Sequence, residues 1–301
     1  MFGRREEVTM SVVNRIDNYR RYLIYKIKWL LSKELRAELS RTKELQNKHK
    51  GERCFIVGNG PSLKHHDLSK LKDEAVFTVN YMMKSDHFKT LNSNYHLFFD
   101  PVVFGLDPNV KEEKEKIDMI DATFASNPDM TYIIPYRRRG NFVKLFPNHK
   151  FKFIYNYKTF ISKLKNASKL HTITPGFQNV IIYAINCAIY MGFKEVYLLG
   201  VDMTGFLEHF EYNKVNSQWG HSYTKTEEEI QLILKTLEEK KIDNEFYLKT
   251  YGKTLEQLKL IFVQASNNDV KLLNASQHGA IDFLPRVDYN QLFTSTNQIT
   301  K

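Results

Sequence analysis

The chain has 301 residues, 42% of them apolar, which is enough for one large domain or two modest ones. No apolar run approaches the ~18 residues of a membrane-spanning helix, and the N-terminus lacks the apolar stretch and cleavage site of a secretory signal. Cys54 and Cys187 lie far apart among apolar neighbours, so we expect reduced core cysteines of a cytoplasmic protein.

The first fifty residues form a basic arm. They hold thirteen Lys and Arg against six Asp and Glu, and so carry seven of the ten net positive charges. Apolar side chains recur at steps of three and four over residues 10–49, which predicts one long amphipathic helix. They are Val12, Ile16, Tyr19, Leu23, Ile27 and Leu30. We interpret this helix as lying in a membrane interface, with packing on its own domain or on a second subunit as the alternatives and nucleic acid not expected.

Residues 51–301 predict one α/β domain with a single, mainly parallel, Rossmann-like sheet. Short apolar strands alternate with helical segments, which is typical of this class. The expected strands are 53–57, 75–79, 96–99, 131–134, 152–155, 195–199 and 270–274. The expected helices are 178–191, buried nearly all round and capped by Gly192, followed by 226–241 and 255–265.

Polar or small residues follow several of these strands. FIVGNGPSL (55–63) places Gly58, Asn59, Gly60 and Ser62 after the first strand, and Gly200 to Gly205 follow a later one. In open α/β sheets ligands bind beyond the carboxyl ends of strands, and small residues there expose backbone N–H groups to phosphates. The motif is neither a Walker A nor a GxGxxG sequence, and a tight turn is the alternative interpretation. Asn80 and Asp100 end two further strands and favour a binding edge.

The loop NSQWGHSY (216–223) is the best candidate for reactivity. It places the imidazole of His221 between a glycine and Ser222, beside Trp219 and Tyr223. A histidine titrates near neutral pH, so His221 is a candidate general base, with a solvated or structural histidine as the alternative. The sequence has no HExxH, CxxC or DxD motif and no metal-ligand spacing, so no metal site is expected.

Taken in order, these motifs resemble the bacterial sialyltransferases of glycosyltransferase family 42 and the wider DUF115-like proteins of surface-glycan assembly. The resemblance covers about residues 51–280. It rests on FIVGNGPSL (55–63), FTVN ending at Asn80, FFDP (98–101), ITPGFQNVIIYAINCAIYMGFKEVYLLGVD (173–202) and NSQWGHS (216–222).

The resemblance implies a variant GT-A fold and inverting, metal-independent transfer from a CMP-activated sugar acid, with no cofactor. His221 would be the general base that takes the proton of the acceptor hydroxyl. Thr204 and Tyr212 would supply hydroxyl groups on the phosphate side. The residues implied in substrate binding are Gly58, Asn59, Gly60, Ser62, Asn80, Asp100, Thr174, Gly176, Asp202 and Ser222.

Three positions depart from the family pattern. Thr204 stands where the family has a tyrosine, Pro175 where it has a serine, and Asp100 where it has an asparagine. Tyr212 is a candidate for the missing hydroxyl. The donor therefore stays open between CMP-sialic acid, CMP-Kdo, a related nonulosonate and another nucleotide sugar.

Two alternative functions are also compatible with the sequence. Archaeal pterin pyrophosphokinases share the DUF115-like fold and use ATP with magnesium, for which Asp100 and Asp202 would supply carboxylates. A non-catalytic scaffold would instead bind a partner through the 10–49 helix. We expect a glycosyltransferase at the inner face of the cytoplasmic membrane. Its acceptor would be a bacterial surface glycan such as capsule or lipooligosaccharide, and self-association through the arm is a further expectation.

Overall fold

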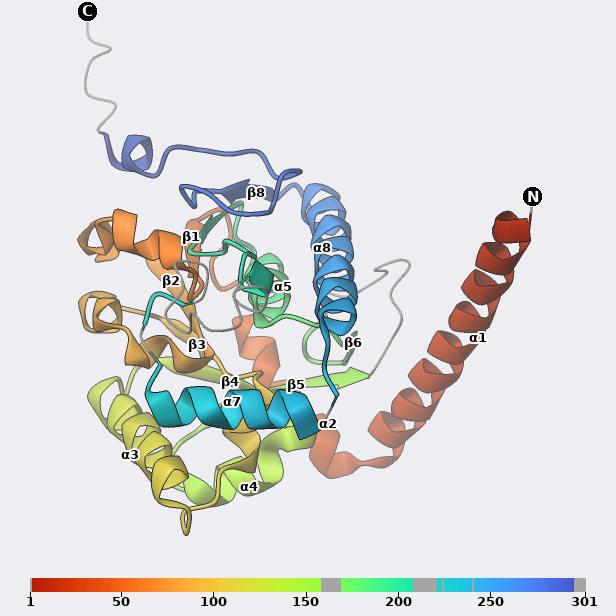
Figure 1. Cartoon of the computed structure of the whole chain (residues 1–301), viewed down its shortest axis with the longest axis horizontal. Helices are drawn as coiled ribbons and strands as arrows, with labels where there is room; N and C mark the ends of the chain where they lie inside the picture. Colours follow the sequence, from red (N-terminus) through yellow and green to blue (C-terminus); the bar gives the residue numbers. More distant parts are fainter. Residues whose placement is uncertain (1, 158–168, 208–220, 224, 240, 295–301) are drawn as a thin grey trace, which may run out of the picture.

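The computed structural model describes residues 2–157, 169–207, 221–223, 225–239 and 241–294, and shows one parallel sheet covered by helices (Figure 1). Eight strands follow the order β6-β5-β4-β3-β2-β1-β7-β8, and every neighbouring pair is parallel. They are β1 (Arg53–Val57), β2 (Ala75–Val79), β3 (Tyr95–Leu97), β4 (Thr131–Pro135), β5 (Phe151–Tyr157), β6 (Ile173–Pro175), β7 (Glu195–Leu199) and β8 (Lys271–Asn274). The predicted Rossmann-like α/β class is confirmed; the short strand β6 was not predicted.

Five helices of the described residues belong to the domain; the last three in chain order were predicted, and the first two were not. They are α3 (Lys111–Ser126), α4 (Arg139–Leu145), α5 (Val180–Met191), α7 (Glu227–Glu239) and α8 (Asn244–Ser266). Helix α8 begins eleven residues before the predicted start at 255, where the carboxylate of Asp243 accepts the Phe246 N–H at 2.8 Å as an N-terminal cap. Gly192 ends α5 in the left-handed conformation, as predicted.

Strand β1 lies at the centre of the sheet and is buried on both faces. Cys54 and Ile56 face the core formed with α5 and α8, whereas Phe55 and Val57 face the core on the other side of the sheet. The chain builds outward from β1 to β6 and then returns through α5 to β7, on the other side of β1. The order therefore reverses between β1 and β7, and the ends of these strands are the expected place for a ligand.

The N-terminal arm is two helices, α1 (Phe2–Leu31) and α2 (Lys33–Ser40), so the prediction of one continuous helix over 10–49 is wrong. Ser32 has an extended backbone between them, and its hydroxyl accepts the Leu35 N–H at 3.1 Å as the cap of α2. Leu35 and Leu39 of α2 are buried in the core of the domain, which the 3.6-residue period alone does not reveal. The domain boundary at residue 50 stays a prediction.

Two further features bear on the expectations from composition. Cys54 and Cys187 are buried as free thiols, and burial raises the pKa of each, so both are poor nucleophiles. Among the described helices, none is both long enough and apolar enough to cross a bilayer.

Candidate functional site

The glycine-rich loop after β1 packs directly on the loop after β7. The N–H of Gly58 donates to the Leu199 carbonyl at 2.8 Å, and the N–H of Gly60 donates to the Gly200 carbonyl at 2.7 Å. A Cβ atom at Gly58 would lie 2.5 Å from the Gly200 oxygen, and one at Gly60 would lie 2.6 Å from that oxygen and from Asp202 Oδ2. The approach of the two strand ends thus requires both glycines, whether or not a ligand also lies there.

Two of the predicted binding residues hold these loops together. Asp202 is 2% exposed, and its Oδ2 accepts the Ser62 N–H at 2.8 Å while its Oδ1 accepts the Ser62 hydroxyl. Asp202 thereby caps the 3₁₀ helix Pro61–His65 from a distant part of the chain. Both side chains are buried and bonded to each other, so the geometry gives them a positioning role behind the loop surface.

Asn80 joins the ends of β2 and β3. Its φ of +46° is left-handed, which is uncommon outside glycine, and its Oδ1 accepts the N–H groups of Phe99 at 2.9 Å and Asp100 at 3.1 Å. The Asn80 Nδ2 donor makes no hydrogen bond to any residue that the structure describes. Asp100 caps the next 3₁₀ turn by accepting the Val102 N–H at 3.0 Å. The structure therefore brings Asn80 and Asp100 together, with a free amide donor beside them.

A buried histidine that was not predicted as a site residue forms a hydrogen bond with the backbone of Asn80. His96 is fully buried, and its Nε2 lies 2.9 Å from the Asn80 carbonyl oxygen while its Nδ1 lies 2.8 Å from Thr78 Oγ1. Because a carbonyl only accepts, Nε2 carries the proton and Nδ1 accepts from the threonine hydroxyl. Burial lowers the pKa of His96 to about 3, so the ring is neutral. The sequence feature that could have identified His96 is its position inside an otherwise apolar strand.

We expect this neutral histidine to make the protein acid-sensitive. The folded pKa lies below the unfolded value of about 6.5, so the unfolded chain gains the proton first and the free energy of unfolding falls as pH drops below that value. Between pH 7.5 and pH 5 the loss is about 2 kcal/mol. Urea unfolding of wild type and His96→Gln at both pH values measures it.

The His96→Gln variant should show a shallower pH slope than wild type, whereas His87→Gln, on a half-exposed side chain, should keep the wild-type slope. Equal slopes for His96→Gln and wild type would contradict the assignment. If His96→Gln does not fold, the wild-type imidazole resonances decide: the His96 ring should not titrate down to pH 5.

The loop with the predicted base meets the β1 loop. The Ser222 N–H donates to the Asn59 carbonyl at 2.8 Å, which places His221 one residue from the strand-end edge. His221 is exposed, and its ring stacks on Tyr223 with 4.9 Å between centroids. Tyr212 and Trp219 fall outside the described residues, and Thr204 is buried near the end of β7.

Three buried polar atoms at this edge have no hydrogen-bond partner among the described residues. They are Asn59 Oδ1, Tyr81 OH and Ser222 Oγ. Burial first, and then the charge of Asp100, raise the pKa of Tyr81, so its hydroxyl stays a donor. Buried polar groups are normally paired, so a group of unpaired ones indicates a missing partner. The site thus offers one acceptor and two hydroxyl donors, beside the free Asn80 amide.

Thr174 lies in β6 and Gly176 in the loop after it. Strand β6 is at the edge of the sheet, three strands from β3 and five from β1, which at ~4.8 Å per strand is roughly 14 and 24 Å. Thr174 is fully buried with its hydroxyl 3.5 Å from the Tyr155 carbonyl, and the Gly176 N–H donates to the Tyr157 carbonyl at 2.8 Å. Thr174 therefore lies outside the group around Asn59 and Asn80, but the loop after β6 approaches that group. The Phe177 N–H donates to the Tyr183 hydroxyl at 2.9 Å, and the Tyr183 ring stacks on Phe99, whose N–H is bonded to Asn80.

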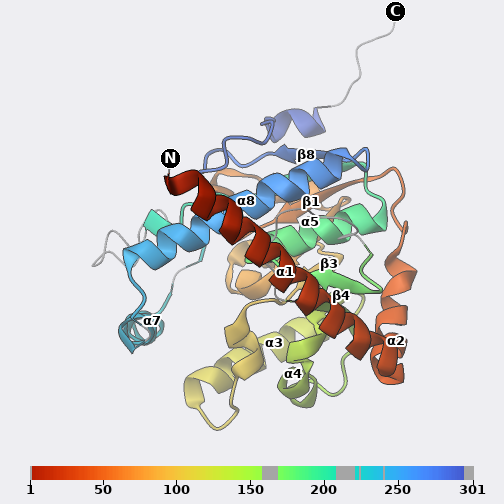
Figure 2. The same ribbon diagram turned by 90° about the vertical axis from the view of Figure 1, so that its right-hand side faces the viewer.

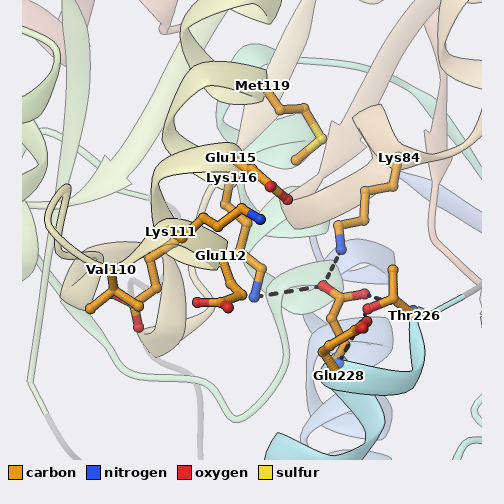
Figure 3. A pocket seen from close by; sticks show the side chains of 11 residues that line it. Lys84, Val110, Lys111, Glu112, Glu115, Lys116, Met119, Thr226 and Glu228 are labelled. Atoms are coloured by element: carbon orange, nitrogen blue, oxygen red, sulfur yellow. Dashed lines mark hydrogen bonds and ion pairs between the residues drawn. The ribbon is translucent and has the colours of Figure 1, made fainter.

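A cavity of about 670 Å³ opens beside this group, between α3, the 3₁₀ helix Asn80–Lys84 and the start of α7 (Figure 3). Lys84 pairs with Glu229, and Lys116 reaches the same carboxylate at 3.6 Å from the opposite side. Burial opposes the charge of Glu229, but the two lysines outweigh it and lower its pKa. Lys84 Nζ also lies 5.4 Å from the Tyr81 ring and 5.8 Å from the Tyr223 ring, so the cavity adjoins the strand-end group.

The carboxylates required by the magnesium-dependent alternative do not fit one ion. Asp100 follows β3 and Asp202 follows β7, three strands apart or roughly 14 Å, whereas magnesium ligands lie about 2.1 Å from the metal. Both oxygens of Asp202 are already bonded to Ser62. Within the described residues, no three His, Cys, Asp or Glu side chains are grouped as metal ligands.

The sheet and its strand-end loops define a Rossmann-like α/β protein. The chain belongs to the 6-hydroxymethylpterin diphosphokinase MptE-like family, whose model matches residues 31–205, more than half of its length. The relation to DUF115-like proteins predicted from the motifs is confirmed by this match. The matched segment runs from the end of α1 past β7 and stops before His221.

Solved structures resemble the chain more distantly. The MAf glycosyltransferase from Magnetospirillum magneticum AMB-1 is 15% identical with a TM-score of 0.46; the alignment covers 84% of this chain but only 38% of that one. The sialyltransferase CstII from Campylobacter jejuni, in complex with the substrate analogue CMP-3FNeuAc, is 17% identical with a TM-score of 0.41, over 77% of this chain and 86% of CstII. No curated protein matches the sequence. Similarities of this size say nothing about substrate.

Proposed function

We propose that the protein is an inverting, metal-independent glycosyltransferase that moves a sugar acid from a CMP donor to a hydroxyl of a bacterial surface glycan. One observation carries the proposal: Asn59 Oδ1, Tyr81 OH and Ser222 Oγ are buried at one strand-end edge, one residue from His221, and have no hydrogen-bond partner in the described part of the chain. A nucleotide carries both hydrogen-bond donors and acceptors, so it could pair with all three of these atoms. The donor and acceptor classes come from the resemblance of the sequence motifs.

The donor would lie over the ends of β1, β2 and β3. Asn59 and the free Asn80 amide would bind its base and sugar, and the half-exposed Asp100 would accept a ribose hydroxyl. Tyr81, Thr204 and Tyr212 would donate hydroxyl hydrogen bonds to the phosphate. Such donors stabilise the charge that develops on a leaving phosphate in place of a metal ion.

His221 would act as the general base. Its imidazole takes the proton of the acceptor hydroxyl while that oxygen forms a bond to the anomeric carbon. The bond from the anomeric carbon to the phosphate oxygen breaks, and CMP leaves with the bonding electron pair. Stacking on Tyr223 at 4.9 Å would hold the ring in position, and the neighbouring cavity with Lys84 and Glu229 would receive the acceptor.

A second candidate is the pterin diphosphokinase activity for which the family is named. The match over residues 31–205 favours it, and no observation at His221 bears on it, since the match ends earlier. It requires magnesium at the nucleotide phosphates. The separation of Asp100 and Asp202 means that other ligands would have to hold that ion.

Nucleotide binding by calorimetry separates the two candidates. We expect CMP to bind equally well in EDTA and in magnesium, and Asn59→Ala to weaken binding about tenfold, the size of one hydrogen bond. Asn59→Ala should change the free energy of unfolding by less than about 1 kcal/mol, because Oδ1 has no partner among the described residues and the Nδ2 donor makes one long bond, 3.4 Å, to the Val79 carbonyl.

The matched control is Asn109→Ala, on an exposed loop residue, which should bind CMP as wild type does. Binding of ATP that requires magnesium, together with no binding of CMP, would overturn the proposal in favour of the second candidate. An unchanged CMP affinity of Asn59→Ala would remove Asn59 from the site.

A further inference from the structure

Over residues 16–31, whose side chains the structure describes, helix α1 contacts the domain through one face. Tyr22 packs on Tyr157 with 5.8 Å between ring centroids, and Tyr25 packs on Tyr155 at 5.4 Å. Trp29 continues this inner face and is half-buried against the core. Figure 1 shows the helix leaving the domain near α2, with its amino-terminal half standing away from α8.

The opposite face of α1 is apolar and exposed. At ~100° per residue, Leu23, Ile27 and Leu30 project about opposite Tyr22, Tyr25 and Trp29. The exposed apolar residues of the helix are Ile16 (65%), Tyr19 (64%), Leu23 (36%), Ile24 (42%), Ile27 (54%), Leu30 (52%) and Leu31 (79%). Arg20, whose side chain is 67% exposed and paired with Asp17, lies among these residues, so the uninterrupted apolar surface runs from Leu23 to Leu31. An exposed apolar surface of this kind marks an interaction site.

Basic residues border this apolar surface on both sides. By the same rotation, Lys26 lies at one margin and Lys28 at the other, and both side chains are exposed. Exposed Arg137 lies beside the inner face, 5.0 Å from the Tyr25 ring, and adds a further charge near the helix. Asp17, the only acidic residue between Ile16 and Leu31, is already paired with Arg20 and Arg21.

We propose that this face of α1 (Ile16 to Leu31) lies in the surface of an anionic lipid bilayer. An apolar stripe bordered by lysines is the pattern that inserts at the boundary of head groups and acyl chains, with the long basic side chains reaching anionic head groups. Two copies meeting through this face would bring Lys26 and Lys28 of each close to those of the other, whereas an anionic surface complements them. The proposal stands independently of the enzymatic activity.

The position of α1 orients the domain on the membrane. The helix docks on Tyr155 and Tyr157, in the carboxyl-terminal half of β5 beside β6. Since all strands run parallel, the same end of the sheet carries the strand-end group of Asn59 and Asn80. Figure 2 shows α1 running diagonally in front of α8 and the sheet. The bilayer would thus lie on the β5–β6 side of the domain, whereas α3 and the start of α7, which flank the cavity proposed for the acceptor, lie on the opposite side in Figure 1.

Vesicle co-flotation of the full chain tests the proposal without any substrate. We expect association with vesicles of phosphatidylcholine and phosphatidylserine, and much weaker association with phosphatidylcholine alone. Leu23→Glu with Ile27→Glu should reduce the association by about 100-fold or more, the value of burying two aliphatic side chains. Lys26→Gln with Lys28→Gln should reduce it about fivefold per charge, on the anionic vesicles only.

The matched control is Leu248→Glu with Val263→Glu, which places two carboxylates at apolar positions of α8 exposed by 51% and 54%. It should float as wild type does. Flotation that survives Leu23→Glu with Ile27→Glu, or no flotation of wild type, would overturn the proposal. A dimer by light scattering that dissociates in the same variant without any vesicle binding would identify the face as a self-association surface instead.

Discussion

His221→Ala is expected to lower the rate of glycosyl transfer roughly 10²- to 10⁴-fold, the usual contribution of a general base. The side chain is exposed, so the substitution creates no cavity and the free energy of unfolding should not change. Donor affinity should also be nearly unchanged, because the proposed role concerns the acceptor proton alone. The measurement is initial rate against donor concentration, which separates kcat from KM.

A merely structural histidine would give a different result. Loss of donor binding with kcat retained would indicate a binding role, and an unchanged rate would exclude His221 as the base. His87→Ala is the control, since no hydrogen bond of the described structure involves its ring and only its backbone atoms are engaged.

Gly60→Ala is expected to disrupt the strand-end loops and with them nucleotide binding. Its Cβ would lie 2.6 Å from the Gly200 oxygen and from Asp202 Oδ2, and the first of these is backbone that cannot yield without moving the β7 loop. Overpacking of this kind costs about 1–3 kcal/mol, and the bond from the Gly60 N–H to the Gly200 carbonyl would be lengthened or lost. Urea unfolding and CMP calorimetry measure the two effects.

The control is Gly252→Ala, in the middle of α8, where nothing lies within 4 Å of the added Cβ. Alanine in a helix interior is favoured over glycine, so this variant should be as stable as wild type or up to about 1 kcal/mol more stable. Wild-type stability of Gly60→Ala would show that the two loops are not packed as described.

The sequence allowed the framework of the fold to be predicted because its signals are local. Buried parallel strands appear as short apolar runs, and Gly192 marks the end of α5 within a few residues. The placement of Asn80 and Asp100 at one edge followed from the rule that parallel strands end together. Thr174 was assigned by the family resemblance alone, and the pairing of its strand β6 at the far edge of the sheet is not encoded nearby.

What could not be predicted depends on contacts between distant segments. The GNG turn indicated a close approach, but its partner, Asp202, lies 140 residues from Ser62 in sequence. The apolar residues before and after Ser32 keep the same helical period, so the sequence pattern does not show that the helix breaks there. The break follows from the packing of α2, which buries Leu35 and Leu39 in the domain. Lys84 of the cavity could not be predicted either, because its partner Glu229 is distant in the sequence.

One readable signal near the cavity went unused. Thr226 and Glu229 have the spacing of a capping box at the start of α7, and the structure shows the reciprocal bonds at 3.3 Å. That spacing fixes where the helix begins and hence where the Glu229 carboxylate emerges. It does not reveal that Lys84 and Lys116 meet this carboxylate from two other elements.

Release of CMP from CMP-sialic acid and from CMP-Kdo, with the full chain, a glycan acceptor extract and excess EDTA, tests the central claim most directly. We predict release from at least one donor at the same rate in EDTA as in magnesium. No release from either donor under any of these conditions, or release that appears only with magnesium, would contradict metal-independent transfer from a CMP sugar.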